Sequence, residues 1–284
     1  EFFGRVNFMK AGLIYSDKIT TVSNTYKDEI RNPFFGENLD GVINTRSADL
    51  YGIVNGLDIN EYNPKTDKNI YVNYGLSDID KKKENKKNLQ RELNLDLNEN
   101  APILAMITRL VPQKGLDLVK RVFDDMMSFN IQFVILGTGE EQYESFFENA
   151  HARYCGKVAA LLKFDEQMAR KIYAGADMFL MPSLYEPCGI SQLIAMRYGT
   201  IPIVRAVGGL CDTVTQYDSQ NDTGNGYLFR NYNAHEMAHT VYLACQAYKG
   251  RTKWQKLMKR AMKTDCSWDK AATQYINLYE IAMR

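Results

Sequence analysis

Residues 103–117 read ILAMITRLVPQKGLD and contain a complete change from strand to helix. The apolar run 103–108 is too short for a typical helix, and the Pro and Gly after it end the extended segment. Beyond Lys114, apolar residues recur at i, i+3, i+4 and i+7, which predicts one helix with a single apolar stripe. That stripe consists of Val119, Val122, Phe123 and Met126. The stretch is therefore typical of a strand followed by a helix that lies on a sheet.

Further short apolar runs follow toward the C-terminus, separated by amphipathic stretches. This alternation predicts an α/β fold, namely a Rossmann-like, doubly wound parallel sheet. We expect strands at residues 103–108, 132–136, 158–162, 178–181 and 201–204. Three later helices, at 234–248, 253–263 and 269–281, follow without intervening strands and are expected to close the domain.

The composition is that of a folded globular protein: 284 residues, 45% of them hydrophobic and 24% charged. The apolar runs end well short of the roughly 18 residues that cross a bilayer, so we expect no membrane partner. With 35 Lys and Arg against 34 Asp and Glu, no overall positive field would attract nucleic acid, which we also exclude as a partner. The Lys-rich run 81–87 is predicted to be a solvated helix face or a linker.

The five cysteines form no C-x-x-C pair, which predicts free thiols in a reducing compartment and a cytoplasmic protein. The chain opens EFFG without Met or a signal-peptide core, so we expect that it begins inside a longer polypeptide. Residues 1–60 are typical of the end of another α/β unit and its connecting segment. The expected domains are therefore 1–60 and 61–284.

Two cations follow the strand at 103–108, at the place where open α/β sheets bind ligands. Arg109 offers a planar guanidinium and Lys114 a point charge, and a helix begins directly after them. Both can meet a diphosphate near the positive end of that helix. Two cations in a surface loop are also common without any ligand, so this pair alone leaves the function open.

A second loop, PSLYEPCGISQL at 182–193, lies between the strand at 178–181 and a helix. Glu186 could hydrogen-bond sugar hydroxyls, and the backbone N–H groups of Gly189, Ile190 and Ser191 could face a phosphate at the start of the helix. The alternative is structural, because Glu in a first helical turn stabilises the helix dipole and Pro and Gly are ordinary turn residues.

A third junction, with Gly208 and Gly209, follows the strand at 201–204. The carboxyl ends of parallel strands open on the same side of a doubly wound sheet. We therefore expect the three loops to converge, although they are distant in sequence. The GTG at 137–139 lacks the third spaced glycine of a dinucleotide fingerprint, and we expect a structural turn there.

Taken together, these loops resemble bacterial glycogen synthases and plant starch synthases. The motifs are TRL with QKGLD (108–110, 113–117), EPCG with QL (186–189, 192–193) and GGL with DTV (208–210, 212–214), in this order and spacing. Shorter matches at VS (22–23), EI (29–30), NGLD (55–58) and NP (63–64) extend the resemblance over nearly the whole chain. Each motif alone is unspecific, and the specificity comes from their joint occurrence.

The resemblance implies a GT-B architecture, in which two Rossmann-like domains face a cleft and residues 61–284 form the nucleotide-sugar-binding domain. It implies transfer of glucose from ADP-glucose or UDP-glucose to the non-reducing 4-OH of an α-1,4-glucan, with retention and with no metal cofactor. The partners are then a nucleotide sugar and a glucan acceptor, while the oligomeric state stays open. A plant or algal source would place the protein in the plastid.

The resemblance also implies roles for individual residues. As catalytic residues, Arg109 and Lys114 would bind the diphosphate and stabilise its leaving charge, and Glu186 would hold the donor glucose. Phe164 would stack on the nucleobase, and Asn55 would lie near the sugar. The other substrate-binding residues implied are Cys188, Gly189, Ile190, Ser191, Gly208 and Gly209.

Two departures from the wider pattern matter. Many other retaining GT-B transferases carry a second Glu eight positions after the first, where this chain has Ile194, in agreement with glycogen synthases. The family's N-terminal Lys-x-Gly-Gly-Leu donor loop and its cleft histidine have no matching segment here. We therefore expect that the chain recognises the nucleotide but is inactive, or nearly so, by itself.

Two alternatives remain at this point: another retaining GT-B transferase, such as a sucrose- or trehalose-making synthase, and a non-catalytic glucan-binding module. The Pro-Cys-Gly turn with Gln192 argues against the first, and the three charged site residues argue against the second. The DID at 78–80 precedes the Lys-rich run in a predicted loop, and His235 and His239 are expected to be a surface pair. No metal site is therefore expected.

Overall fold

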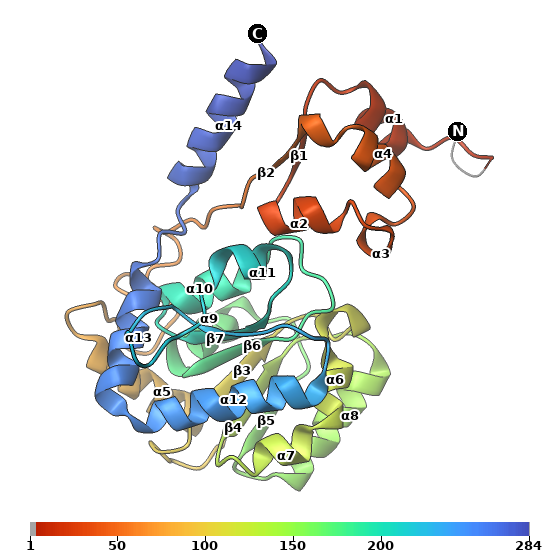
Figure 1. Cartoon of the computed structure of the whole chain (residues 1–284). Helices are drawn as coiled ribbons and strands as arrows, with labels where there is room; N and C mark the ends of the chain where they lie inside the picture. Colours follow the sequence, from red (N-terminus) through yellow and green to blue (C-terminus); the bar gives the residue numbers. More distant parts are fainter. Residues whose placement is uncertain (1–3, 284) are drawn as a thin grey trace.

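A six-stranded parallel sheet with helices on both faces forms the larger part of the molecule (Figure 1), in a computed structural model that describes residues 4–283. Its spatial order, β5-β4-β3-β6-β7-β8, is that of a doubly wound dinucleotide-binding sheet, so the predicted fold class is confirmed. The strands are β3 Ile103–Ile107, β4 Gln132–Leu136, β5 Val158–Leu161, β6 Met178–Met181, β7 Ile201–Arg205 and β8 Tyr227–Phe229. Five agree with prediction to within one residue; the short β8 was not predicted.

Two groups of helices cover the two faces of this sheet (Figure 1). One face carries α6 Leu116–Arg121, α7 Phe123–Met127, α8 Glu141–Arg153 and α12 Ala234–Lys249. The other carries α5 Lys82–Glu92, α9 Glu166–Gly175, α10 Ser191–Arg197 and α13 Arg251–Lys263. The remaining elements near the sheet are α11 Gly208–Thr213 and the 3-10 turns η2 Ile79–Lys81 and η3 Pro112–Lys114.

The predicted apolar stripe after Lys114 is confirmed, since all four of its side chains are at most 1% exposed. The prediction of a single helix is wrong, because the backbone at Val122 (φ −120°) leaves the helical range and separates α6 from α7. Packing on the sheet therefore follows the predicted pattern while the helix itself is interrupted.

The N-terminal segment forms a small unit with its own two-stranded parallel sheet, β1 with β2. Its elements are α1 Phe8–Tyr15, β1 Ile19–Thr21, α2 Asn24–Glu29, α3 Pro33–Gly36, α4 Asp40–Thr45, η1 Ser47–Asp49 and β2 Leu50–Gly52. The last helix, α14 Trp268–Ala282, leaves the large sheet and packs Ala271 and Leu278 against Ile53, beside β2 (Figure 1). Of the three C-terminal helices expected to close the domain, α12 and α13 therefore cover the sheet and α14 does not. The domain boundary at residue 60 stays a prediction.

Two helices, α2 and α11, cap each other across the junction between these parts. The Asp212 carboxylate of α11 accepts hydrogen bonds from the backbone N–H of Asn24 (2.7 Å) and of Thr25 (3.2 Å). In return, Glu29 at the end of α2 accepts from the backbone N–H of Gly208 at 3.0 Å. Each helix thus supplies a carboxylate to the N-terminus of the other, where the helix dipole favours negative charge. The N-terminal segment is thereby tied to the loop after β7.

The Lys-rich run lies at the beginning of α5, and the prediction of a solvated face or linker is wrong for two of its lysines. Lys82 and Lys86 are only 4% and 6% exposed. The Lys82 Nζ donates to the Tyr173 and Ala174 carbonyls at 3.1 and 2.8 Å and to the Thr200 hydroxyl at 2.8 Å. The two carbonyls lie in the last turn of α9, so this ammonium serves as a C-terminal cap for that helix.

The helix lengths, the cysteines, the two histidines of α12 and the DID sequence were also subjects of prediction. None of the helices in residues 4–283 is long and apolar enough to span a bilayer. All five cysteines are free thiols, and His235 and His239 are both exposed on α12, as predicted. Asp78 pairs with Lys81 at 2.8 Å, and Asp80 with Lys83 at 3.5 Å. The two aspartates of the DID sequence are therefore engaged in surface ion pairs.

The burial of Lys82 predicts a pH dependence of stability. Desolvation lowers the pKa of Lys82 to about 7, so above pH 7 the folded chain releases a proton that the unfolded chain keeps up to about pH 10.5. The free energy of unfolding should rise with pH by on the order of 1 kcal/mol per pH unit above pH 7 because of this residue. Urea unfolding of wild type and Lys82→Met at pH 6.5, 7.5 and 8.5 measures the effect. A stability difference that stays constant over this range would contradict it.

Candidate functional site

The three loops singled out in the sequence meet at the carboxyl edge of the sheet, where β3 and β6 are neighbours. The chain runs from β3 outward to β4 and from β6 outward to β7, so this is the point at which the strand order reverses. Ligands of doubly wound folds bind at such a switch point. The expected convergence is confirmed: the loop after β3 carries Lys114 and the loop after β6 carries Glu186, and the two side chains are in contact.

Lys114 and Glu186 form an ion pair with 2.7 Å between Nζ and Oε2. The side chains are 17% and 10% exposed, so the pair is largely shielded from water. The Ser183 hydroxyl donates to the same carboxylate oxygen at 2.9 Å. All three residues line a hollow of about 60 Å³ together with Gly189, Ile190 and Ser191 at the start of α10. A cation, a carboxylate and the amino end of a helix thus border one small space.

Close packing of the two loops holds this pair together. Gly115 has φ +71°, and a Cβ there would lie 2.0 Å from the Pro182 carbonyl oxygen, so only glycine fits. The backbone N–H of Leu184 donates to the carbonyl of Gln113 at 2.8 Å. Lys114 lies between these two contacts, and its position relative to the loop after β6 is therefore determined by backbone geometry.

Arg109 and Phe164 line a second, larger hollow of about 240 Å³. Thr108 borders both hollows, which makes them neighbours along the loop after β3. The Phe164 ring is 85% exposed, an unusual state for an aromatic side chain of this size. Gly137 and Thr138 also line this hollow, and the Leu110 N–H donates to Thr138 at 2.8 Å, which supports the predicted structural turn.

Gly208 and Gly209 contact the Glu186 loop through their backbones. The Gly208 N–H donates to the Glu29 carboxylate. The Gly209 N–H donates to the carbonyls of Glu186 and Pro187 at 3.2 and 3.1 Å. At Gly208, with φ +43°, a Cβ would lie 2.0 Å from the Glu186 carbonyl oxygen. Both glycines therefore support the loop that carries Glu186, and direct substrate binding by them stays a prediction.

Cys188, in the loop that carries Glu186, contacts Asn55. The Cys188 side chain is buried, burial raises the pKa of its thiol, and the backbone N–H of Asn55 hydrogen-bonds to the sulfur. Asn55 belongs to the segment after β2, so the structure brings a residue of the N-terminal part to the turn at 186–189. Its contact with a sugar stays a prediction.

Two residues of the site were given no role from sequence. Arg205, the last residue of β7, donates to the Leu184 and Ser183 carbonyls at 2.6 and 3.3 Å, and desolvation lowers its pKa. Gln192 is fully buried and donates to the Gly189 carbonyl at 3.0 Å. Arg205 follows a predicted strand at the same sheet edge as Arg109, so the rule that selected Arg109 could also have found it.

Comparisons with known proteins agree with this geometry. The profile of the family "Glycosyl transferases group 1" matches residues 86–260, and that of the "Starch synthase catalytic domain" matches residues 1–45. Glycogen synthases from Pseudothermotoga lettingae and Bacillus anthracis are 53% and 51% identical to this chain over its whole length. The chain spans 59% and 60% of the lengths of these two relatives.

A solved structure, the catalytic domain of starch synthase IV from Arabidopsis thaliana bound to ADP and acarbose, superposes with a TM-score of 0.92 at 37% identity. The match covers 98% of this chain and 58% of that one. A sucrose-phosphate synthase from Thermosynechococcus elongatus shares the fold at 20% identity, with a TM-score of 0.66 and coverage of 97% and 60%. The predicted resemblance to glycogen and starch synthases is confirmed, and with the profile match over 86–260 it shows that this chain belongs to the group 1 glycosyltransferase family.

Proposed function

We propose that this chain is the nucleotide-sugar-binding part of a glycogen or starch synthase. The whole enzyme would transfer glucose from ADP-glucose or UDP-glucose to the non-reducing end of an α-1,4-glucan with retention. The observation that carries the proposal is the shielded Lys114–Glu186 pair at the switch point of the sheet, beside the hollow lined by Arg109 and Phe164. Sequence identities of 50–53% with glycogen synthases support the choice of substrate class.

The charges of the site suit a diphosphate leaving group. Arg109 can bind two phosphate oxygens through its planar guanidinium. The Lys114 ammonium has three donors, so it can keep its bond to Glu186 and still contact a phosphate oxygen. Both cations would stabilise the charge that develops as the bond to glucose breaks, because they are already held in place by the fold.

The remaining residues would position the sugar and the base. Glu186 has a second carboxylate oxygen that can accept hydrogen bonds from glucose hydroxyls, while Lys114 and Ser183 hold the first. The N–H groups at Gly189, Ile190 and Ser191 precede or open α10, and the first N–H groups of a helix have no acceptor within it. Phe164 presents an exposed ring on which a nucleobase can stack.

Other parts of the proposal rest on the family alone. That no metal is needed stays a prediction, with Arg109 and Lys114 taking its electrostatic role. A glucan acceptor and a cytoplasmic location are proposed because the curated relatives named above are bacterial glycogen synthases, and these relatives give no support to a plastid. The competing functions are a transferase to small sugars and a glucan-binding module, and a trial of glucan against small-sugar acceptors in the complete protein would separate the three.

The donor site is tested by calorimetric titration of ADP, UDP and ADP-glucose into the 284-residue chain, in the presence of EDTA. We expect saturable binding that weakens at least tenfold in Arg109→Ala and in Lys114→Ala, because each change removes a charge-assisted contact worth more than about 1.4 kcal/mol. Arg91→Ala, which removes an exposed cation from α5, is the matched control. Binding that needs added Mg²⁺, or that survives both site changes, would contradict the proposal.

A second experiment isolates the role of Phe164. Phe164→Ala should weaken ADP binding about fivefold, since one stacking contact contributes about 1 kcal/mol, and should leave the affinity for pyrophosphate unchanged. The exposed ring makes few contacts in the folded chain, so stability should not change. Equal losses for ADP and pyrophosphate would show that the ring does not contact the base.

Catalysis by the 284 residues alone is a separate prediction. Transfer of glucose needs donor and acceptor held in one geometry, and the described residues offer the donor side of a cleft. We therefore expect that incorporation of labelled glucose from ADP-glucose into glycogen is at least a hundredfold slower than with the Bacillus anthracis relative as reference. A comparable rate would show that these residues form a complete active site.

A further inference from the structure

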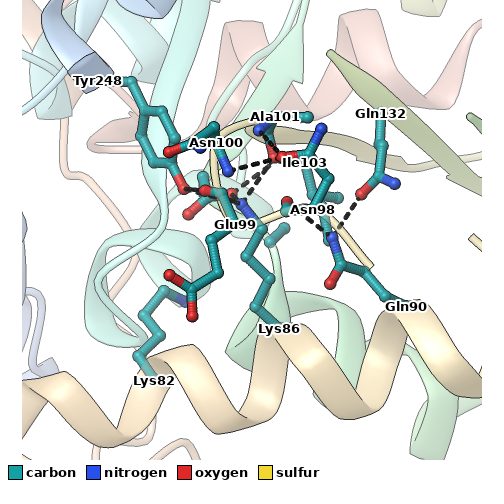
Figure 2. Close-up of polar contacts among 12 residues, drawn as sticks. Lys82, Lys86, Gln90, Asn98, Glu99, Asn100, Ala101, Ile103, Gln132 and Tyr248 are labelled. Atoms are coloured by element: carbon teal, nitrogen blue, oxygen red, sulfur yellow. Dashed lines mark hydrogen bonds and ion pairs between the residues drawn. The ribbon is translucent and has the colours of Figure 1, made fainter. Parts of the chain in front are cut away.

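A cavity of about 500 Å³ lies at the opposite, amino end of the six-stranded sheet. It is larger than either hollow at the carboxyl edge and lies between α5, the segment 97–100 and the beginning of α13. Figure 2 shows Lys82, Lys86 and Gln90 rising from α5 toward the segment 98–101. Nothing in the donor site accounts for this cavity, because the two lie at opposite ends of the strands.

The floor of the cavity is a completed polar network around Lys86. Its ammonium forms an ion pair with Asp177 at 2.8 Å. It also donates to the Ala101 carbonyl and the Tyr248 hydroxyl, each at 2.7 Å (Figure 2). The three donors of this ammonium thus have four acceptors, one of them charged, with the Glu99 carbonyl the most distant at 3.4 Å. Lys86 is therefore satisfied within the protein and needs no ligand.

Three other cations around the cavity have no carboxylate partner among residues 4–283. Lys82 is buried in its wall and bonds only to neutral oxygens. Arg251 lies over the Tyr248 ring, 4.2 Å from its centroid, and donates to the carbonyl of Glu99 and to the side chain of Asn100. Lys87 is exposed on α5. None of the three therefore has its charge neutralised by an ion pair within residues 4–283, and burial lowers the pKa of Lys82 to about 7.

The cavity also carries an excess of positive charge. Its lining holds five cations, Lys82, Lys83, Lys86, Lys87 and Arg251, against three carboxylates, Asp80, Glu99 and Asp177. The excess is two positive charges below pH 7 and falls to one above it, where Lys82 is neutral. The sign of this local field favours an anion on either side of pH 7.

Neutral polar side chains in the wall of the cavity can form hydrogen bonds with a ligand. Asn98, Asn100, Thr252 and Gln255 offer amide and hydroxyl groups. Trp254, which also lines the cavity, is only 4% exposed, and its Nε1–H has no hydrogen-bond acceptor in the described structure. A buried donor without an acceptor is rare in folded proteins. The volume lies within the range of small-molecule sites.

We propose that this cavity is a second ligand site, which binds a small molecule bearing a phosphate group, with Lys87 and Arg251 contacting the phosphate oxygens. A phosphate monoester carries a charge of about −1.5 to −2 at pH 7, and its oxygens match the planar donors of arginine. The same chemistry is offered by inorganic phosphate and by a phosphate monoester. This site does not depend on the donor site proposed above.

The test is calorimetric titration of inorganic phosphate, glycerol 3-phosphate and glycerol into the 284-residue chain. Because the donor site would also attract phosphate, all variants carry Arg109→Ala and Lys114→Ala. We expect saturable 1:1 binding of both phosphates and none of glycerol, with at least a tenfold loss in Lys87→Ala/Arg251→Gln. The matched control is Lys253→Ala/Lys256→Ala, which removes two exposed charges from α13 outside the cavity.

Each outcome decides the proposal. Retained binding in the control and loss in the Lys87/Arg251 variant support it, and tighter binding of glycerol 3-phosphate than of phosphate identifies an ester as the ligand class. Absence of phosphate binding, or equal losses in the two double variants, overturns it. Lys87→Ala alone, with an expected loss of at least threefold, keeps the test valid if Arg251→Gln disturbs the contact with Glu99. The donor-site titrations are separate, so the failure of one site leaves the other standing.

Discussion

Close contact between the backbones of three loops is the constraint on which the candidate site depends. A side chain at Gly115 or at Gly208 would place a Cβ 2.0 Å from a carbonyl oxygen of the loop after β6. Because both positions are glycine, the loops after β3 and β7 can each pack closely against the loop after β6. Lys114 and Glu186 can then form a 2.7 Å ion pair although they lie in loops that follow different strands of the sheet. The charges of the site are thus positioned by main-chain packing.

The same constraint connects the site to the N-terminal part of the chain. Gly208 is held on one side by the Glu186 loop and on the other by Glu29 of α2, whose pKa is raised by burial. Asp212, at the other end of the same short helix, fixes the beginning of α2. A movement of α2 relative to the sheet would therefore reach the turn that carries Glu186 through Gly208, which contacts both.

The predictions for lysine residues succeeded at one end of the sheet and failed at the other. At the carboxyl edge, the position of Lys114 followed from a general rule about parallel strands, and the structure agrees. At the amino end, a rule about charged runs failed for Lys82 and Lys86, because their acceptors come from Tyr173, Ala174 and Asp177, distant in sequence. A rule that counts charges in one segment cannot detect such partners.

The sequence by itself determined the α/β class, five of the six strands of the large sheet and the convergence of three loops, because apolar runs and Gly and Pro act locally on the backbone. Only the tertiary structure decided that the Gly208 and Gly209 N–H groups are occupied, that α14 packs beside β2, and that two lysines of a charged run are buried. These features depend on hydrogen-bond partners and packing surfaces contributed by remote segments. The free energy of burying a polar group is set by those partners, and they come together only when the chain is folded.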